Sequence, residues 1–142
     1  MNVAVGLVFN KERKILINRR PEGKTFAGYW EFPGGKIEAG ETAVEALIRE
    51  FFEETGLQLL KPTYFMALSY QMQEKEIHLH VFQCFEYQGE PQCLEGQAEM
   101  CWVSVDEIND YQFPEANEAI IKRLLQIKLN NNESLTRQFL KE

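Results

Sequence analysis

The sequence predicts a single α/β domain in which a mixed sheet carries helices on its faces. Short runs of aliphatic and β-branched residues are typical of strands, and two stretches have the apolar spacing of amphipathic helices. Their order along the chain is strands, helix, strands, helix. With 142 residues, of which 44% are hydrophobic and 26% charged, the chain can bury one globular core. We therefore expect a domain over residues 1–130 and a polar tail over 131–142.

The first expected elements are two strands joined in a hairpin. Residues 3–10 and 14–19 are rich in valine, isoleucine and leucine, and a polar turn separates them. Residues 21–28 are expected to form a loop, followed by an aromatic segment at 29–32. A second loop, which contains adjacent glycines, continues to Glu41.

A helix is expected from Thr42 to Thr55. Thr42 and Glu45 have the spacing of a capping box, in which each side chain accepts a hydrogen bond from the other residue's backbone. Gly56 is placed to end the helix. Apolar residues at helical spacing predict one buried stripe, and they are Val44, Leu47, Ile48, Phe51 and Phe52.

The second half of the chain repeats the pattern. Strands are expected at 63–72, 77–87 and 100–103, the first two forming a second hairpin. Ser104 and Glu107 have capping-box spacing and predict a short helix. A longer apolar stripe predicts a helix that begins near Asn117, and the Asn130–Asn132 run is expected to break it.

Charge and composition exclude several classes of protein. A net charge of −7 disfavours nucleic acid polymers, so an anionic substrate must be held by local cations. No apolar run approaches the roughly 18 residues of a membrane span, and we expect a cytoplasmic monomer without a membrane partner. Three cysteines without C-x-x-C spacing indicate free thiols, buried or half-buried, and not a disulfide framework or zinc site; they are Cys84, Cys93 and Cys101.

The helix from Thr42 carries an unusual concentration of acid. Glu50, Glu53 and Glu54 fall on one patch near its C-terminal end, while Glu45, Arg49 and Glu53 are spaced as an i, i+4 ladder. Each like-charge pair costs about 0.2–0.5 kcal/mol, and the helix dipole disfavours acids there. A hard divalent cation with oxygen ligands would relieve the repulsion. The alternative on the helix alone is a solvated acidic face.

The loop before the helix favours the metal site. Phe32-Pro33-Gly34-Gly35-Lys36 lets backbone approach a ligand closely and supplies one cation. Together, loop and helix fit the pattern G-x5-E-x7-R-E-U-x-E-E-x-G-U, where U is a bulky apolar residue, at every fixed position. The matching residues are Gly35, Glu41, Arg49, Glu50, Phe51, Glu53, Glu54, Gly56 and Leu57. This segment resembles the Nudix box.

The resemblance implies a fold and an activity. Nudix hydrolases are α/β/α sandwiches with a loop-helix-loop catalytic motif, and they cleave a nucleoside diphosphate linked to another group using Mg²⁺ or Mn²⁺. Three further strings resemble the MutT branch, and the likeness spans about residues 1–128; the strings are 31–38, 95–97 and 113–118. The implied substrate is a small-molecule nucleoside triphosphate, 8-oxo-dGTP, attacked at the β-phosphorus to give 8-oxo-dGMP and pyrophosphate. Such an enzyme sanitises the nucleotide pool, a DNA repair function that avoids mutation.

The resemblance also implies catalytic and metal-binding residues. The metal ligands would be Glu50, Glu53, Glu54, Glu95 and the carbonyl of Gly34. The same glutamates would carry catalysis, with Arg49 orienting them. Glu95 would be a ligand or the base, and which glutamate deprotonates water is open.

Candidate substrate-binding residues each have a second interpretation. Arg20 and Lys36 are candidates for phosphate contacts or are solvated loop cations. Asn117 offers a donor and an acceptor to a purine edge, but asparagine is also an excellent helix N-cap. An apolar slot for the base would be formed by residues that could equally be core, namely Val3, Phe32 and Ile77.

Two other functions stay open at this point. The strand Ile77–His80 bears some likeness to relatives that hydrolyse CTP or 5-methyl-dCTP. A non-catalytic module that binds a nucleotide is the third interpretation, against which the complete acidic set argues. Lys75 stands where the MutT branch tends to carry arginine, which weakens an expectation of a bidentate contact there. His78 and His80 share a strand face, but the carboxylates offer a better metal site.

Overall fold

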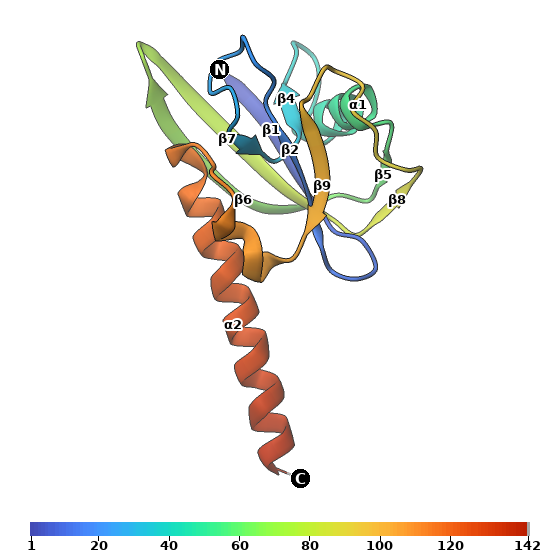
Figure 1. Ribbon diagram of the computed structural model, residues 1–142, viewed down its shortest axis with the longest axis vertical. Helices are drawn as coiled ribbons and strands as arrows, with labels where there is room; N and C mark the ends of the chain where they lie inside the picture. The colour runs from blue at the N-terminus through green and yellow to red at the C-terminus, as the bar shows by residue number, and fades with distance from the viewer. Residues whose placement is uncertain (142) are drawn as a thin grey trace.

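The computed structural model describes the backbone of residues 1–141 and the side chains of residues 1–129. Its strands are β1 (Asn2–Val8), β2 (Ile15–Arg19), β3 (Trp30–Glu31), β4 (Gly34–Lys36), β5 (Gln58–Leu60), β6 (Thr63–Met72), β7 (Lys75–Cys84), β8 (Glu86–Gln88) and β9 (Glu99–Val103). Its helices are α1 (Ala43–Thr55), the short 3₁₀ turns η1 (Val105–Asp110) and η2 (Glu115–Asn117), and α2 (Glu118–Lys141). Figure 1 shows the strands between α1 and α2.

The central sheet is mixed, as the sequence predicts. Its strand order is β4-β1-β7-β6, with β1 parallel to β7 and antiparallel to β4. The hairpin expected in the second half of the chain is confirmed, because β6 and β7 pair antiparallel around a turn at Gln73–Glu74. The continuous strand expected to Tyr87 is instead divided: β7 ends at Cys84, and β8 pairs with β5 in a separate two-stranded sheet.

The first expected hairpin is wrong. Strand β2 pairs with β3 and β9 in a second sheet, and its contact with the end of β1 is a single bridge between Phe9 and Ile15. The reason lies in the central sheet: β4 and β7 already occupy the two edges of β1. The tight turn at residues 10–14 is present, but it carries the chain from one sheet to the other.

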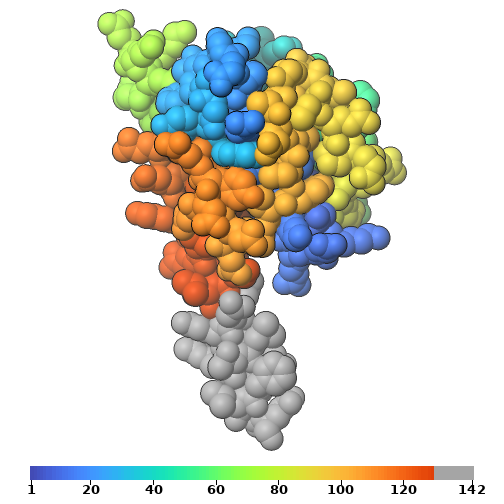
Figure 2. Space-filling view, in the orientation of Figure 1, coloured from blue at the N-terminus to red at the C-terminus, as the bar shows by residue number. Residues whose placement is uncertain are grey.

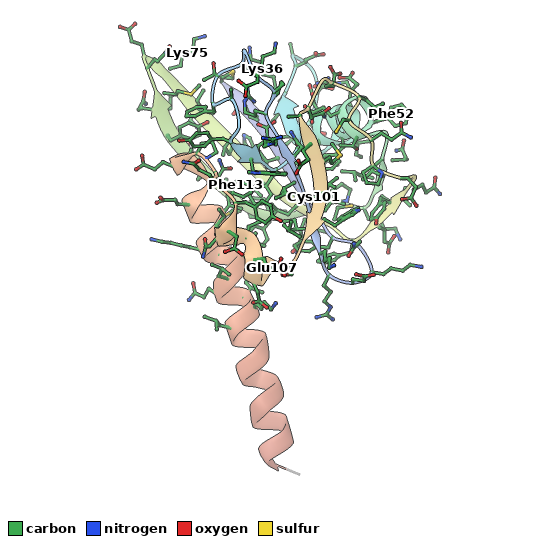
Figure 3. The ribbon with its side chains drawn as sticks, viewed as in Figure 1. Lys36, Phe52, Lys75, Cys101, Glu107 and Phe113 are labelled. Carbon is green, nitrogen blue, oxygen red and sulfur yellow. The ribbon has the colours of Figure 1, made fainter. Side chains whose placement is uncertain are left out.

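Helix α1 begins and ends as predicted, and its buried stripe is confirmed at every position except Phe52. The side chain of Thr42 accepts from Glu45 N, the side chain of Glu45 accepts from Thr42 N, and Gly56 ends the helix with φ +78°. The fully buried side chains are Ala46, Leu47, Phe51 and Thr55. Phe52 is 55% exposed and points away from the sheets in Figure 3, so placing it in the buried stripe is wrong. Glu50 and Glu54 are half-buried beside this stripe.

The apolar core consists of two clusters on opposite faces of the central sheet. One cluster contains Leu47 and Phe51 of α1 together with Ala4 and Val8 of β1. The other contains residues of β1, β2 and β7 and the first turns of α2. A Cβ atom at Gly6 would lie 3.1 Å from Leu47 Cδ1, so this glycine lets α1 pack close to β1. The expected helix, sheet, helix layering is therefore confirmed.

Three smaller expectations need correction. Ser104 precedes η1, but its side chain makes no capping hydrogen bond. Helix α2 begins at Glu118, as expected, but its backbone continues through Asn130–Asn132 to Lys141. The side chains of the expected tail lie outside the described residues, so the domain boundary at residue 130 stays a prediction. The three cysteines are free thiols, but Cys93 is exposed. In the part of the chain described, no helix is long and apolar enough to cross a membrane.

Candidate active site

Two glycines of β4 bring backbone against the carboxylates of α1. The N–H of Gly34 donates to Glu54 Oε2 at 3.1 Å, so strand and helix are joined at this point. A Cβ atom at Gly35 would lie 2.5 Å from Glu50 Oε2, and one at Gly34 would lie 2.9 Å from the Cα of Val5. Side chains here would displace either the carboxylate or the neighbouring strand. The glycines therefore shape the space that the carboxylates occupy.

Arg49 connects the acidic residues on either side of it. Its guanidinium donates twice to Glu41, from Nε to Oε2 at 2.7 Å and from Nη2 to Oε1 at 2.9 Å. Its Nη1 donates to Glu50 Oε1 at 3.0 Å and to Glu53 Oε2 at 3.4 Å. The fork geometry of arginine suits such bidentate contacts. The expected ladder from Glu45 is not formed, because the Glu45 side chain caps the helix.

The Arg49 contacts lower the pKa of Glu41. Its hydrogen bonds with Arg49 and the backbone N–H of Glu38 lower the pKa of Glu41 from 4.5 to about 2. In return, Glu41 raises the pKa of Arg49 above its usual value. Sequence reasoning placed Glu41 in the motif without a role. The structure places it as the partner that fixes the direction of the guanidinium.

Glu54 and Glu50 have the opposite character. Burial, followed by repulsion from Glu50, Glu31 and Glu95, raises the pKa of Glu54 to about 8 despite its hydrogen bond from Gly34. Burial also raises the pKa of Glu50, although Arg49 opposes this shift. A half-buried carboxyl among other acids favours a bound cation or a proton. The described site thus has negative potential that Arg49 only partly offsets.

The donor set fits a hard divalent cation by its chemistry. It consists of carboxylate oxygens and a glycine-rich strand close to them, and the half-buried Glu54 carboxylate accepts one hydrogen bond, from the N–H of Gly34. Among residues 1–129, no three acidic, histidine or cysteine side chains already gather as a metal-binding group. Glu50 and Glu53 turn toward Arg49, while Glu54 turns toward Gly34. The metal roles of these residues therefore stay a prediction.

The loop between β8 and β9 carries Glu95 to the same end of α1. Glu95 is exposed, and it lies close enough to Glu54 to contribute to its raised pKa. Gln97, which sequence reasoning left without a role, joins this loop to α1: its Nε2 donates to the carbonyl of Glu54 at 3.0 Å. The signal that could have identified it is its place in the Glu95–Gln97 string.

A cavity of about 820 Å³ opens on the α2 side of the central sheet. Its walls come from β1, β6 and β7, the segment from Arg20 to Glu31, and residues 114–117. It brings together three predicted substrate-binding residues, which are Val3, Arg20 and Asn117. Sequence reasoning missed Phe26 and Glu31 in the lining, because nothing in their local pattern shows which segments meet in space.

Other predicted binding residues lie elsewhere. Phe32 is 5% exposed and stacks on Phe113 with ring centroids 4.9 Å apart, and Ile77 is 1% exposed. Both belong to the core and neither lines the cavity. Lys36 is exposed on β4, where its carbonyl accepts from Arg49 Nη2 at 3.1 Å. Lys75 lies at the tip of the β6–β7 hairpin in Figure 3.

Glu31 links the cavity to the carboxylate helix. It accepts from Arg20 Nη1 at 3.0 Å and from Asn18 Nδ2 at 3.1 Å, and Asn18 is only 2% exposed. Arg20 also donates from Nε to the carbonyl of Thr25 at 2.6 Å. Glu31 lines the cavity and lies close enough to Glu54 to help raise the pKa of that carboxyl, so the cavity lies near the carboxylates.

The arginine-bound carboxylates of α1 and the glycines of β4 that lie against them are the structural counterpart of the motif that resembles the Nudix box. A sequence model of the NUDIX domain matches residues 4–123, and the chain belongs to this family. Nudix hydrolases depend on a divalent metal ion.

Particular relatives refine the comparison. The chain is 38% identical over 124 residues to the 8-oxo-dGTP diphosphatase of Escherichia coli K12, covering 87% of this chain and 95% of that protein. It is 31% identical to the CTP pyrophosphohydrolase of the same organism, covering 87% and 91%. A solved MutT structure from work on Aliivibrio salmonicida and Vibrio cholerae superposes with a TM-score of 0.79 at 32% identity, covering 88% and 96%.

Proposed function

We propose that this protein is a pyrophosphohydrolase that converts 8-oxo-dGTP into 8-oxo-dGMP and pyrophosphate with Mg²⁺ or Mn²⁺. The reaction would remove an oxidised guanine nucleotide before it enters DNA. The observation that carries the proposal is a cavity lined by Asn117, Arg20 and Glu31, of which Glu31 lies near enough to the Glu54 carboxyl to help raise its pKa. The identity of 38% to a protein named for this activity supports the choice of base.

The cavity would hold the nucleoside. Asn117 donates from Nδ2 to the carbonyl of Pro114 at 3.4 Å, a long hydrogen bond that a purine acceptor could replace at little cost. Val3 and Leu79 supply apolar wall on the sheet side. Base recognition here would therefore combine one amide with an apolar surface.

The carboxylate helix would hold the cation and the triphosphate end. Glu50, Glu53, Glu54 and Glu95, with the carbonyl of Gly34, would be the ligands. A cation bound there supplies positive charge to the phosphate oxygens and makes an attacking water more acidic. A carboxylate of this set would accept the proton of that water. Attack of the water on the β-phosphorus would break the bond to the α-phosphate oxygen, expel 8-oxo-dGMP and leave pyrophosphate, which contains the water oxygen.

Three cationic side chains would assist without binding the metal. Arg49 would hold Glu50 and Glu53 in their orientations, as its hydrogen bonds at 3.0 and 3.4 Å indicate. Arg20 would exchange part of its pairing with Glu31 for a phosphate oxygen, since a guanidinium suits both anions. Lys36, exposed on the neighbouring strand, would reach the outer phosphates.

Pyrophosphate release tests the proposal. Purified protein with Mg²⁺ would be offered 8-oxo-dGTP, dGTP, CTP, 5-methyl-dCTP and ADP-ribose at equal low concentration. We expect kcat/KM to be highest for 8-oxo-dGTP and the activity to be lost in Glu53→Gln. Glu12→Gln, an exposed carboxylate in the turn before β2, is the matched control. If pyrophosphate release is lost in Glu53→Gln and retained in Glu12→Gln, the hypothesis of a non-catalytic binding module is also excluded.

Asn117 is tested by a change from amide to acid. Asn117→Asp removes the donor, and we expect kcat/KM for 8-oxo-dGTP to fall by about 10- to 100-fold, the value of one or two lost hydrogen bonds. Asn109→Asp makes the same change at an exposed position of η1 outside the cavity and should have no effect. Equal losses for 8-oxo-dGTP and for a poor substrate would assign Asn117 to structure and not to base recognition.

A pyrimidine triphosphate is the second candidate substrate. It is favoured by the 31% identity to a CTP pyrophosphohydrolase over most of both chains. A higher kcat/KM for CTP or 5-methyl-dCTP than for 8-oxo-dGTP would replace the first proposal. The hydrolytic chemistry would be unchanged, because it depends on α1 and β4 and not on the cavity.

A further inference from the structure

The loop from Gly89 to Ala98 is fastened to the C-terminal end of α1. The last carbonyls of a helix have no partner within it and require donors from elsewhere. Here Gln92 N donates to Thr55 O at 3.0 Å, and Leu94 N donates to Glu54 O at 3.1 Å. The loop therefore uses the free carbonyls of the helix as its anchor, and it lies at the molecular surface in Figure 2, in yellow.

Among the described hydrogen bonds, one joins a side chain of this loop to α1, and its donor is Gln97. Its Nε2 donates to Glu54 O at 3.0 Å, and its Oε1 accepts from Glu95 N at 2.9 Å. The side chain thus spans the backbones of two acidic residues. Gln97 is half-buried, whereas its neighbours from Gln92 to Gly96 are exposed. Gly96, with φ +73°, provides the turn that brings the amide back over Glu95.

We propose that Gln97 is a positioning residue that holds Glu95 beside the C-terminal turn of α1, and therefore beside the Glu54 carboxylate. The proposal rests on the function proposed above, because Glu95 must take part in the reaction. A primary amide can form both bonds at once, because its NH₂ group donates to the Glu54 carbonyl while its oxygen accepts from the Glu95 N–H. An exposed loop held by backbone bonds alone would let Glu95 sample many positions, which a metal ligand or base cannot tolerate.

The test compares two variants of Gln97 with a control from the same loop. Gln97→Ala removes both bonds, and Gln97→Glu keeps an acceptor while placing an oxygen against the Glu54 carbonyl. Gln92→Ala is the control, because it keeps the Gln92 backbone N–H that bonds Thr55. We expect kcat for the best triphosphate substrate to fall by about 10-fold in both Gln97 variants, with KM nearly unchanged and Gln92→Ala unaffected.

A double-mutant cycle separates positioning from a general effect on folding. If Gln97 acts through Glu95, adding Gln97→Ala to Glu95→Gln causes no further loss of kcat. Multiplicative losses of kcat in the double variant would overturn the proposal. A fall in Tm large enough to account for the lost activity of Gln97→Ala would overturn it too. Full activity of Glu95→Gln would overturn it as well, even with 8-oxo-dGTP as the best substrate. If another triphosphate is the best substrate, only the assignment of the nucleobase is overturned, and the positioning role of Gln97 is not.

Two readouts need no turnover. Amide exchange of Glu95 N–H, followed by NMR, should accelerate at least about 10-fold in Gln97→Ala and remain unchanged in Gln92→Ala. Titration with Mn²⁺ alone should show affinity weakened about 10-fold in Gln97→Ala, the lower end of the loss caused by removing residues that orient metal ligands. Unchanged exchange at Glu95 would show that the backbone contacts suffice and would refute the positioning role.

Discussion

Removing the charge of Glu54 is expected to stabilise the metal-free protein at alkaline pH. Burial and neighbouring acids raise the pKa of this carboxyl from 4.5 to about 8 in the folded protein. Below pH 4.5 the group is protonated in both states and contributes nothing. As pH rises from 4.5 to 8, the unfolded chain releases a proton that the folded chain keeps, so the free energy of unfolding falls. The full penalty applies above about pH 8.

The magnitude follows from the pKa difference. Each pKa unit corresponds to about 1.36 kcal/mol, so complete transfer of this difference would be about 4.8 kcal/mol. Because water still reaches part of the carboxyl group, we expect about half of this, about 2–3 kcal/mol, from Glu54→Gln at pH 8.5. For a domain of this size, that stabilisation raises Tm by about 8–12 °C. At pH 4 the variant should show almost no gain.

Thermal unfolding between pH 4 and 9, with and without Mg²⁺, measures the effect. In the unsubstituted protein, Mg²⁺ should restore the stability lost at high pH, because a cation offsets the charge that the site concentrates. Glu54→Gln should respond less to Mg²⁺. Glu53→Gln is the control on the same helix, since the Glu53 side chain is 48% exposed. A Tm for Glu54→Gln that is equal to or below that of the unsubstituted protein at pH 8.5 without metal would refute this reasoning.

Three further predictions concern α1 and its contacts. Gly35→Ala would place a Cβ atom 2.5 Å from Glu50 Oε2, and we expect kcat to fall at least about 10-fold with circular dichroism unchanged; full activity would show that the carboxylate moves freely. Arg49→Lys loses the bidentate contact with Glu41, and we expect kcat/KM to fall by about 10- to 100-fold. Full activity of the lysine variant would show that Arg49 acts only through its positive charge. Thr42→Ala removes the cap and should cost about 1 kcal/mol in urea unfolding while leaving kcat at 25 °C unchanged; a change in kcat would show that capping and catalysis are coupled.

The sequence predicts most of the fold because local signals and global packing agree there. The capping box at Thr42, the left-handed Gly56 and the β6–β7 hairpin are each determined within a few residues, and all three are confirmed. The β1–β2 hairpin is wrong because strand partners depend on competition for edges. Nothing within residues 1–19 shows that β4 and β7 will occupy both edges of β1.

The buried stripe of α1 is misassigned only at Phe52, and the error bears on function. Hydrophobicity selects Phe52 for the inside and Glu54 for the outside, yet Phe52 is exposed while burial is the main cause of the raised Glu54 pKa. Burying an acid costs free energy that a stable helix would avoid. An exposed Phe52 beside a half-buried Glu54 is a local conflict with the apolar pattern of the kind expected where function opposes stability.

Glu31 and Gln97 show what sequence reasoning leaves out of such a site. Both act through hydrogen bonds between segments far apart in the chain: Glu31 accepts from Asn18 and Arg20, and Gln97 reaches back to Glu54. A motif records the residues of one segment, so it contains the acids but not the groups that fix their surroundings.

Glu31 also predicts a coupling between substrate and metal. It forms an ion pair with Arg20 and repels Glu54. A phosphate that draws Arg20 away would leave the charge of Glu31 less neutralised and would make a cation near Glu54 more favourable. Substrate and metal binding should therefore strengthen each other, with Mn²⁺ affinity higher in the presence of a non-hydrolysable triphosphate, and lower coupling in Glu31→Gln would identify this pair as its source.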